Sequence, residues 1–585
     1  MAPDPTPRYM APVEAHPTAR PPTRRTLAAV GLCAFALLYA FPYFPRINNP
    51  NENVRFYMTA ALVEEGTYRI DEPRARWGWV NDAAVREGHY YSVKAPGTSL
   101  LGVPGYAAYR WLAGDGFDRT TALWVVRLTG TILPTLVFLF FFHRWLGERT
   151  RHPAVRDTVF LSVALGSLLL AYGYMFASHT TAAAVAFGAF MVLYDARHRG
   201  RLSSGGAFLA GLLAAGVTAF EYPGFFLSML LCAYALSALR PWRRLVPFAA
   251  GALVPTVAVM HFHWSAFGHP LSPGHLFVEN PAFRQNHEQG FFGASGFHPE
   301  AAWRLLFDFR IGLLVLTPVL VLAVPGFVRL LSRRSQRLDA LVALGASVSL
   351  YVFICFMNIW DAGWAVGPRY LAPVVPFLAW GAVACLDAVA DVTPRFAGAV
   401  GVGCAACGFV AAGVPSVYYP HLPPGLDWPL AHLLALLIQH DFAPMNAGNL
   451  LGWYGTASML PLYLLAIFAL GWAAWTYRRP ATRAWVLGVG ALVAAFLLLP
   501  HFRAPPADVP ARRSIAFITR TWHPEGHDRA ARLEERLAQE RGSAPEDFRR
   551  LSELYRAEGR MREARAATRR ANHGASSRLD HTLGD

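Results

Sequence analysis

Residues 121–143 read TALWVVRLTGTILPTLVFLFFFH, and Arg127 is the only one of them that carries a formal charge. A helix of about twenty apolar residues spans the hydrocarbon core of a bilayer, which is about 30 Å thick. The stretch therefore predicts a transmembrane helix. Twelve further runs of similar character predict an all-α, polytopic transmembrane helical bundle of about thirteen spans: 27–45, 158–176, 179–194, 205–221, 223–239, 245–266, 310–330, 338–358, 370–390, 396–418, 457–476 and 484–500.

The overall composition supports this class. Of the 585 residues, 54% are hydrophobic and 16% are charged, whereas soluble proteins carry about 25% charged residues. The net charge of +15 would suggest nucleic acid on a soluble domain, but the arginines lie mainly in short loops and in the C-terminal tail, so no nucleic-acid binding is expected. The cysteines all lie in apolar runs, which predicts neither a disulfide framework nor a zinc site.

Basic residues predict the orientation of the chain, because cytoplasmic loops are enriched in Lys and Arg. Arginines before the first run predict a cytoplasmic N-terminus, residues 1–26. If spans alternate, the arginine-rich loops all fall on that side: 144–156, 197–201, 240–244, 329–337 and 478–483. Residues 97–113 and 429–439 are predicted to be juxtamembrane or half-inserted helices, because counting them as spans would invert the later loops. An odd number of spans places the tail, 501–585, on the extracytoplasmic side.

The other polar residues concentrate in three predicted extracytoplasmic loops, 45–96, 267–308 and 358–370. Few ionisable residues lie in the middle of a run, where transporters usually have their sites. This distribution favours a reaction or a binding event at the outer membrane face, within a catalytic unit of residues 27–500. A lipid-linked sugar flippase or another transporter is one alternative, and a non-catalytic membrane scaffold is another.

Lys94 is the only lysine of the chain. A lysine ammonium is a compact charge on a flexible stem and is not interchangeable with arginine at a phosphate site, so Lys94 predicts a phosphate contact. The alternative is chance, since some position must hold the last lysine. In the second loop, His275, Asn286 and His287 belong to a segment that is long enough to close over a bound donor.

Three motifs carry a resemblance to a known family: YYSVKAPGTSLLGVP at 90–104, FGHPLSPGH at 267–275 and WDAGWAVGPRYLAPVVPFL at 360–378. Over about residues 27–390 the chain resembles the GT-C membrane glycosyltransferases, which include the RgtA/B/C/D-like, protein O-mannosyltransferase and aminoarabinose transferase families. The resemblance implies an inverting enzyme of a bacterial inner membrane. Such an enzyme moves a sugar from a polyprenyl-phosphate donor to a lipid, glycan or protein acceptor at the extracytoplasmic face.

The same resemblance implies a carboxylate that orients or deprotonates the acceptor, and cations that stabilise the leaving phosphate. Glu52 stands where the family has an acidic residue after the first span, so it is expected to be the catalytic base. Asp71, in the same loop, is a second candidate carboxylate. Lys94 and Arg369 are expected to bind the phosphate.

Further substrate contacts are expected from Tyr91, His179 and Tyr370. Many family members have a second aspartate between the third and fourth spans, where this chain has Ser178 and His179. Glu221, which begins the next outward turn, is the candidate to supply that missing carboxylate.

Each of these assignments has a structural alternative. Glu52 and Asp71 would otherwise be solvated loop carboxylates, and Arg369 would form a salt bridge to Asp361. The tyrosines would otherwise belong to the aromatic belt of a membrane interface. The chain has no recognisable metal-ligand spacing, so no metal site is predicted, and dependence on a divalent cation is left open.

Within the tail, residues 545–572 carry small and apolar residues at the spacing of one tetratricopeptide helix pair. A single repeat cannot bury its own hydrophobic face, so this pair is predicted to pack on the membrane domain or on a protein partner. An amphipathic helical hairpin without a binding role is the alternative.

Overall fold

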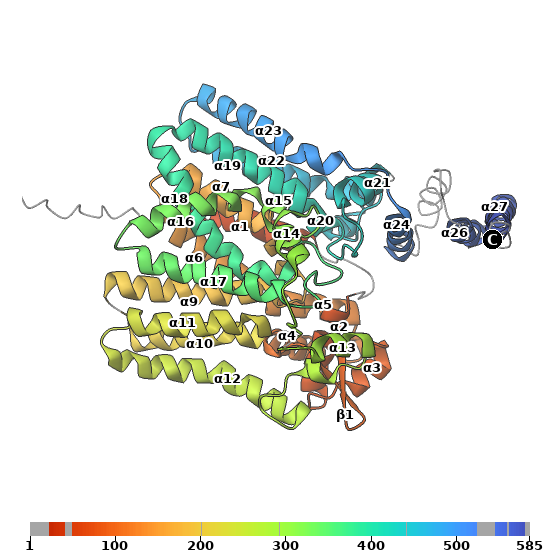
Figure 1. The fold of residues 1–585 in the computed structure, drawn as a ribbon, viewed down its shortest axis with the longest axis horizontal. Coiled ribbons are helices and arrows are strands. Elements are labelled where there is room, and N and C mark those ends of the chain that lie inside the picture. The colour runs from red at the N-terminus through yellow and green to blue at the C-terminus, as the bar shows by residue number, and fades with distance from the viewer. Residues whose placement is uncertain are drawn as a thin grey trace, which may run out of the picture.

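The computed structural model describes residues 23–40, 49–200, 202–291, 293–439, 441–522, 545–557 and 561–579. In these ranges the protein is all-α apart from one two-stranded hairpin, which confirms the predicted fold class. Most helices lie side by side and form the body of the molecule (Figure 1). The N-terminal segment 1–22 and the first residues of the loop 45–96 lie outside the described residues.

All thirteen predicted apolar runs fall on helices. The first seven are represented by α1 (Thr23–Tyr39), α5 (Arg119–Arg127) with α6 (Leu133–Gly147), α7 (Pro153–Leu165) with α8 (Leu168–Tyr174), α9 (His179–Arg199), α10 (Ser204–Phe220), α11 (Phe225–Ala238) and α12 (Leu245–Phe267). The last six are represented by α15 (Leu313–Leu316) with α16 (Ala323–Ser332), α17 (Arg337–Cys355), α18 (Val375–Val392), α19 (Pro394–Gly408) with α20 (Val414–Tyr418), α22 (Leu460–Ala474) and α23 (Pro480–Phe502).

The number of these helices that cross the membrane is a separate question. Seven helical stretches in the described ranges are long and apolar enough to cross, or eight if α7 and α8, which meet at 56°, form one broken span. Several others, including α10 and α11, are apolar but shorter than a full span. The chain is therefore a multi-pass membrane protein, and the count of thirteen spans stays a prediction.

The arginine-rich loops gather at one end of the bundle, on the left of Figure 1. Ion pairs join them: Arg149 lies 2.6 Å from Asp195, and Arg197 lies 2.9 Å from Asp339. The helix α1 begins at this same end. Loops that are far apart in the sequence thus share one face, as the charge bias predicts for a single side of a membrane.

The first predicted outer loop is a small folded unit at the opposite end of the bundle (Figure 1). The loop forms α2 (Pro50–Glu64), α3 (Asp71–Trp77) and the antiparallel strands β1 (Ala83–Arg86) and β2 (His89–Ser92), and it packs with α4 (Gly97–Ala113), which covers the segment predicted to be a juxtamembrane or half-inserted helix. The helix α2 starts where Asn49 accepts a hydrogen bond from the Asn51 N–H, with Pro50 at its first position. Buried aromatic side chains such as Phe56 and Tyr106 form the core of this unit.

The second predicted outer loop is attached to that unit. It contains a short turn (Gly274–Phe277), α13 (Pro281–Glu288) and α14 (Pro299–Phe307). The Glu279 N–H donates to the Ala83 carbonyl at 2.9 Å, and the Glu279 carboxylate lies 2.8 Å from the Arg74 guanidinium. These contacts hold the loop against the edge of β1.

The helices α10 and α12 approach each other very closely because glycines face each other at their crossing. A Cβ atom on Gly211 would lie 1.9 Å from the Phe248 carbonyl oxygen, and one on Gly251 would lie 1.9 Å from the Phe208 carbonyl oxygen. Small residues at such crossings let helix backbones pack tightly in membranes. This crossing fixes one wall of the cavity described below.

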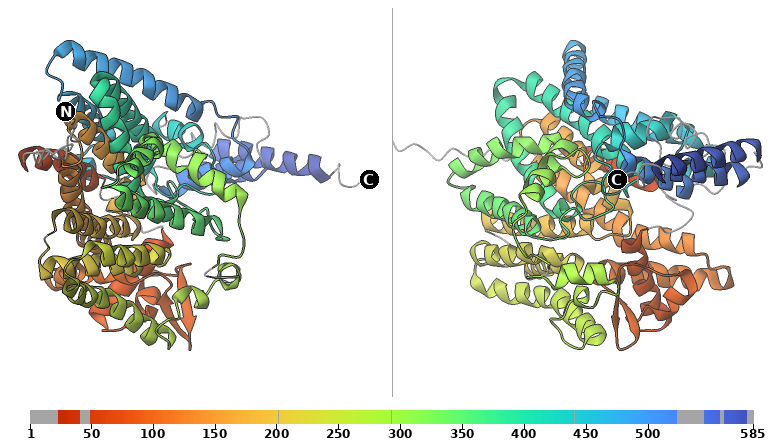
Figure 2. Two further views of the ribbon diagram at one scale, coloured as in Figure 1. Left: turned by 60° about the vertical axis from the view of Figure 1, so that its left-hand side comes forward. Right: turned by 45° about the vertical axis from the view of Figure 1, so that its right-hand side comes forward.

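The tail consists of α24 (Val509–Trp522), α26 (Pro545–Ala557) and α27 (Met561–Leu579). The helices α26 and α27 form a hairpin in which the Ser552 hydroxyl donates to the Ala564 carbonyl at 2.9 Å. Arg513 of α24 lies 2.9 Å from Glu546 of α26. The tail projects from the same end of the molecule as α2 and α3 (Figures 1 and 2), so it shares a side with the predicted outer loops.

Candidate functional site

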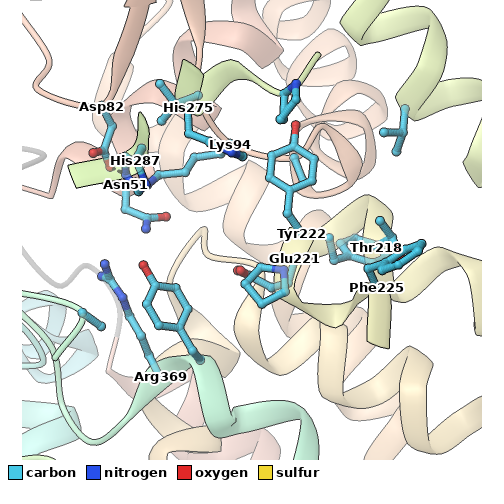
Figure 3. A pocket seen from close by; sticks show the side chains of 18 of the residues that line it. Asn51, Asp82, Lys94, Thr218, Glu221, Tyr222, Phe225, His275, His287 and Arg369 are labelled. Carbon is cyan, nitrogen blue, oxygen red and sulfur yellow. Dashed lines mark ion pairs between the residues drawn. The ribbon is translucent and has the colours of Figure 1, made fainter. Parts of the chain in front are cut away.

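One large cavity, of about 1160 Å³, lies at the end of the bundle that carries the folded loops. Its walls come from α2, the residues that flank the hairpin, the helices α10, α11, α12 and α17, the loop 267–298 and the segment 357–370. The cavity has a polar part near the loops and an apolar part between the helices. Figure 3 shows the polar part, with Lys94 and Asp82 on one wall and Arg369 on the facing wall.

The apolar part runs between α11 and α12. Phe226 and Met229 of α11, Val259 and Met260 of α12, and Phe353 of α17 line it. Met229 is 57% exposed, so this part is open at the side of the bundle rather than sealed. An apolar groove that opens among membrane helices can hold a lipid chain that continues into the bilayer.

Lys94 and Asp82 are brought together by the hairpin. Asp82 precedes β1, Lys94 follows β2, and the register pairs Ala83 with Ser92. Because the two residues lie just beyond the open end of this short ladder, the Lys94 ammonium reaches the Asp82 carboxylate at 3.1 Å. Burial alone would raise the pKa of Asp82, but the charge and hydrogen bond of Lys94, together with the charges of Arg369 and Arg55, outweigh burial, and the pKa lies below its ordinary value.

Glu221 is the second carboxylate of the cavity and lies in the turn after α10. Its side chain lies 3.0 Å from the His179 imidazole and 3.7 Å from the Arg55 guanidinium, and it accepts a hydrogen bond from the Ser178 hydroxyl. Burial by itself would raise the pKa of Glu221, but its interactions with His179, Arg55 and Ser178 together outweigh burial and hold the pKa at about 2. The carboxylate is therefore ionised at any physiological pH.

Arg369 begins the 3-10 turn η7 (Arg369–Val374) and faces the cavity together with Tyr370. In the described part of the chain no carboxylate lies within 4 Å of its guanidinium, and its buried Nε has no hydrogen-bond partner. The predicted alternative, a salt bridge to Asp361, is not present, because Arg310 rather than Arg369 lies near that residue, at 3.8 Å. Arg369 is thus oriented toward the cavity with no carboxylate in direct contact, and its charge acts on that of Asp82 across the cavity.

These side chains give the polar part a surplus of positive charge. Arg55, Lys94 and Arg369 are cations, whereas Asp82 and Glu221 are the carboxylates among the described residues that line it. Buried charges are stable when they are paired. One unpaired cation in a shielded chamber is therefore a binding site for an anion such as a phosphate.

Two histidines of the second loop, His275 and His287, line the outer wall of the cavity. Burial, with a contribution from neighbouring positive groups, lowers the pKa of His275 to about 3 and that of His287 to about 4. Both imidazoles are therefore neutral near pH 7. Across the described chain, no three His, Cys, Asp or Glu side chains are arranged to hold a metal ion.

Glu52, the predicted catalytic base, does not line the cavity. It is 1% exposed, and both its oxygens accept hydrogen bonds from Arg127, at 2.8 Å and 2.7 Å. It also accepts a hydrogen bond from the Phe176 N–H at 2.6 Å. Burial alone would raise the pKa of Glu52, but Arg127, the Phe176 N–H and His421 together outweigh burial, and the pKa is lowered. These contacts tie α2 to α5 and to the segment that follows α8.

Three other predicted site residues also lie outside the cavity lining. Asp71 accepts hydrogen bonds from the Tyr90 N–H at 3.0 Å and from His89 at 3.1 Å, and so supports the hairpin. Tyr91 is buried against Phe267, with ring centroids 5.8 Å apart. His179 contacts Glu221 from behind. The structure therefore brings together Lys94, Arg369, Tyr370 and Glu221, and places Glu52, Asp71 and Tyr91 elsewhere.

No protein-family model and no curated protein matches this chain. Solved structures of one protein are similar to it. The structure of ArnT from Cupriavidus metallidurans in the apo state is 17% identical, covers 88% of this chain and 80% of its own, and has a TM-score of 0.46. The structure of the same protein bound to undecaprenyl phosphate is 17% identical, covers 85% of this chain and 79% of its own, and has a TM-score of 0.44.

Sequence reasoning missed two charged residues of the cavity, Arg55 and Asp82. Arg55 lies one helical turn after Asn51 and donates to the Asn51 carbonyl at 3.0 Å, so both face the same side of α2. A prediction of α2 as a helix would have indicated that Arg55 shares a face with Asn51. Asp82 is less clearly indicated by the sequence, because only the hairpin register shows that it lies beside Lys94.

Proposed function

We propose that this protein is an inverting glycosyltransferase that moves a sugar from a polyprenyl-phosphate donor to an acceptor at the extracytoplasmic face of a bacterial inner membrane. The observation that carries the proposal is the composition of this cavity. A chamber in which the Arg369 guanidinium has no carboxylate in direct contact continues into an apolar groove that opens at the side of the bundle. A ligand with a phosphate head and a long apolar chain matches both parts.

The dimensions of the groove suit the proximal end of a polyprenyl chain. Its lining on α12 extends from His263 to Ala252, which is about 16 Å along a helix that rises 1.5 Å per residue. The first isoprene units would lie in this groove, and the rest of the chain would leave between α11 and α12 and continue in the bilayer. The phosphate would then lie between Lys94 and Arg369.

In the proposed reaction an acceptor hydroxyl attacks the anomeric carbon, the bond from that carbon to the phosphate oxygen breaks, and the configuration inverts. The polyprenyl phosphate leaves with the electron pair. Lys94 and Arg369 stabilise its growing negative charge. Glu221 orients the hydroxyl and takes its proton as the new bond forms. Glu52, Asp71 and Tyr91 take no part in these steps.

The direct test is a transfer assay with purified protein and radiolabelled polyprenyl-phosphate sugars. We expect Glu221→Gln to lower kcat by about a hundredfold or more, because the acceptor loses its charged partner. Arg369→Ala and Lys94→Ala are expected to lower kcat/KM by about two orders of magnitude. Arg69→Ala is the matched control, since Arg69 is exposed at the same end of the molecule but does not line the cavity.

The assay also separates this proposal from its rival. Tight binding of the donor without any product, in the presence of a broad set of acceptors, would indicate a carrier of lipid-linked sugars instead. Equal turnover by the Glu221→Gln protein and the wild type would remove the proposed base.

A further inference from the structure

The helix α27 presents a face of exposed arginines that the proposed reaction does not use. Arg562, Arg565 and Arg569 are all exposed and follow one another at intervals of three and four residues, which places them on one side of the helix over about 10 Å. We call these three residues the arginine face. The opposite side of α27 packs on α26 through Ala564, Ala567 and other small residues that are at most 4% exposed.

The position of this face favours a ligand in solution over the lipid headgroups of the protein's own membrane. The hairpin of α26 and α27 projects from the end of the bundle, away from the apolar helices (Figures 1 and 2). A basic segment attracts an anionic membrane only within about one Debye length of the surface.

Its composition is unlike the centre of a protein interface, which is depleted in charge and built on aromatic or aliphatic anchors. Met561 is the only large apolar side chain of α27 recorded as exposed in the described range. A row of guanidinium groups without an apolar anchor suits a flexible polymer that carries an acid on successive units, because each guanidinium can pair with a carboxylate or a phosphate.

The tail is also in contact with the cavity. Phe517 of α24 lines the cavity, and its ring lies 5.8 Å from that of Trp364. His432 donates to the Pro505 carbonyl at 2.7 Å and so attaches the segment before α24 to the bundle. Arg513 and Glu546, 2.9 Å apart, connect α24 to the hairpin. A polymer bound to the arginine face would therefore be tethered through α26 and α24 to the wall of the cavity, which raises its effective concentration there.

We propose that the arginine face binds an acidic polysaccharide and thereby holds the acceptor at the mouth of the cavity. The binding step follows from the tail alone, and the acceptor role rests on the proposed glycosyltransferase function. A hydroxyl of the bound polysaccharide would be the group that attacks the donor.

The test measures binding of fluorescently labelled polygalacturonate and of neutral dextran to the full-length protein in a neutral detergent. The variant Arg562→Gln/Arg565→Gln/Arg569→Gln is expected to bind polygalacturonate about tenfold more weakly than the wild type, because three exposed ion contacts are lost. The control Arg333→Gln/Arg334→Gln/Arg478→Gln removes the same charge from exposed positions at the opposite end and should bind within about twofold of the wild type.

Three results would each overturn the proposal: the tail variant binds polygalacturonate as tightly as the wild type, the wild type binds dextran as tightly as polygalacturonate, or phosphatidylglycerol vesicles displace the polymer.

The binding assay contains no sugar donor, so its result does not depend on catalysis. Loss of polymer binding with normal transfer to small acceptors would remove only the role of the arginine face. Normal polymer binding without transfer to any acceptor would remove the glycosyltransferase function and leave the binding face.

Discussion

At the scale of single residues, Glu52 and Arg127 form a buried ion pair. Both side chains are almost fully buried, and the two oxygens of Glu52 accept hydrogen bonds from Arg127 and from the Phe176 N–H. The resemblance that nominated Glu52 rested on its position after the first span. Arg127 lies 75 residues further along the chain, inside an apolar run, where its sequence context predicts a helix and gives no sign of this partner.

We expect Glu52→Gln to destabilise the protein by about 3–5 kcal/mol, because it leaves Arg127 buried without a counter-charge. The double variant Glu52→Gln/Arg127→Met should recover much of that loss. Thermal unfolding in detergent measures both effects, and kcat is normalised to the folded fraction. A Glu52→Gln protein of wild-type stability that has lost its turnover would contradict the structural role and restore Glu52 as the base.

The histidines of the outer loops make stability depend on pH. Burial lowers the pKa of His275 to about 3 and that of His287 to about 4, whereas an unfolded chain titrates histidine near pH 6.5. The unfolded state therefore binds more protons than the folded state below about pH 6.5, and stability falls as the pH falls through this range. We expect the Tm to be lower at pH 5 than at pH 7.

The variant His287→Gln tests whether these histidines cause the pH dependence of the Tm, because it removes one of the two imidazoles that are neutral in the folded state. Its Tm should change less between the two pH values than that of the wild type. A dependence of the same size in the variant would show that other groups determine it.

At the scale of elements, the contact of α10 with α12 shapes the wall of the cavity. We expect Gly211→Val to lower the stability and to weaken donor binding, because the side chain would overlap the Phe248 backbone and separate the two helices. Gly216→Ala is the matched control on the same helix, since a Cβ there meets nothing within 4 Å, and it should leave both properties unchanged or raise the stability slightly. Thermal unfolding and equilibrium binding of the donor measure the two outcomes. Donor binding that survives Gly211→Val would show that this wall does not contact the lipid.

The same scale shows what the sequence could predict. Apolar runs of about twenty residues predicted the helices correctly, because that signal is local and depends on length and composition alone. The hairpin was not predicted, since each of its strands has only four residues. Its register is what places Asp82 beside Lys94, so this pair could not be found from the sequence.

At the scale of the whole molecule, charge bias alone predicted that the arginine-rich loops share one end, and the structure places them together there. Lys94 and Arg369 were singled out because each departs from its surroundings, one as the only lysine and the other as an outward arginine. The cavity that joins them depends on chain segments hundreds of residues apart. No local pattern describes such a cavity, so its apolar part was not foreseen.

The most direct measurement is photocrosslinking with a polyprenyl phosphate that carries a photoreactive group near its phosphate end. The proposal predicts that the labelled peptides map to residues 225–232 of α11 and 252–263 of α12, and that labelling falls with excess unlabelled lipid and in the Arg369→Ala protein. Labelling spread equally over the distant apolar helices α22 and α23, and unchanged by Arg369→Ala, would contradict a lipid-phosphate site in this cavity.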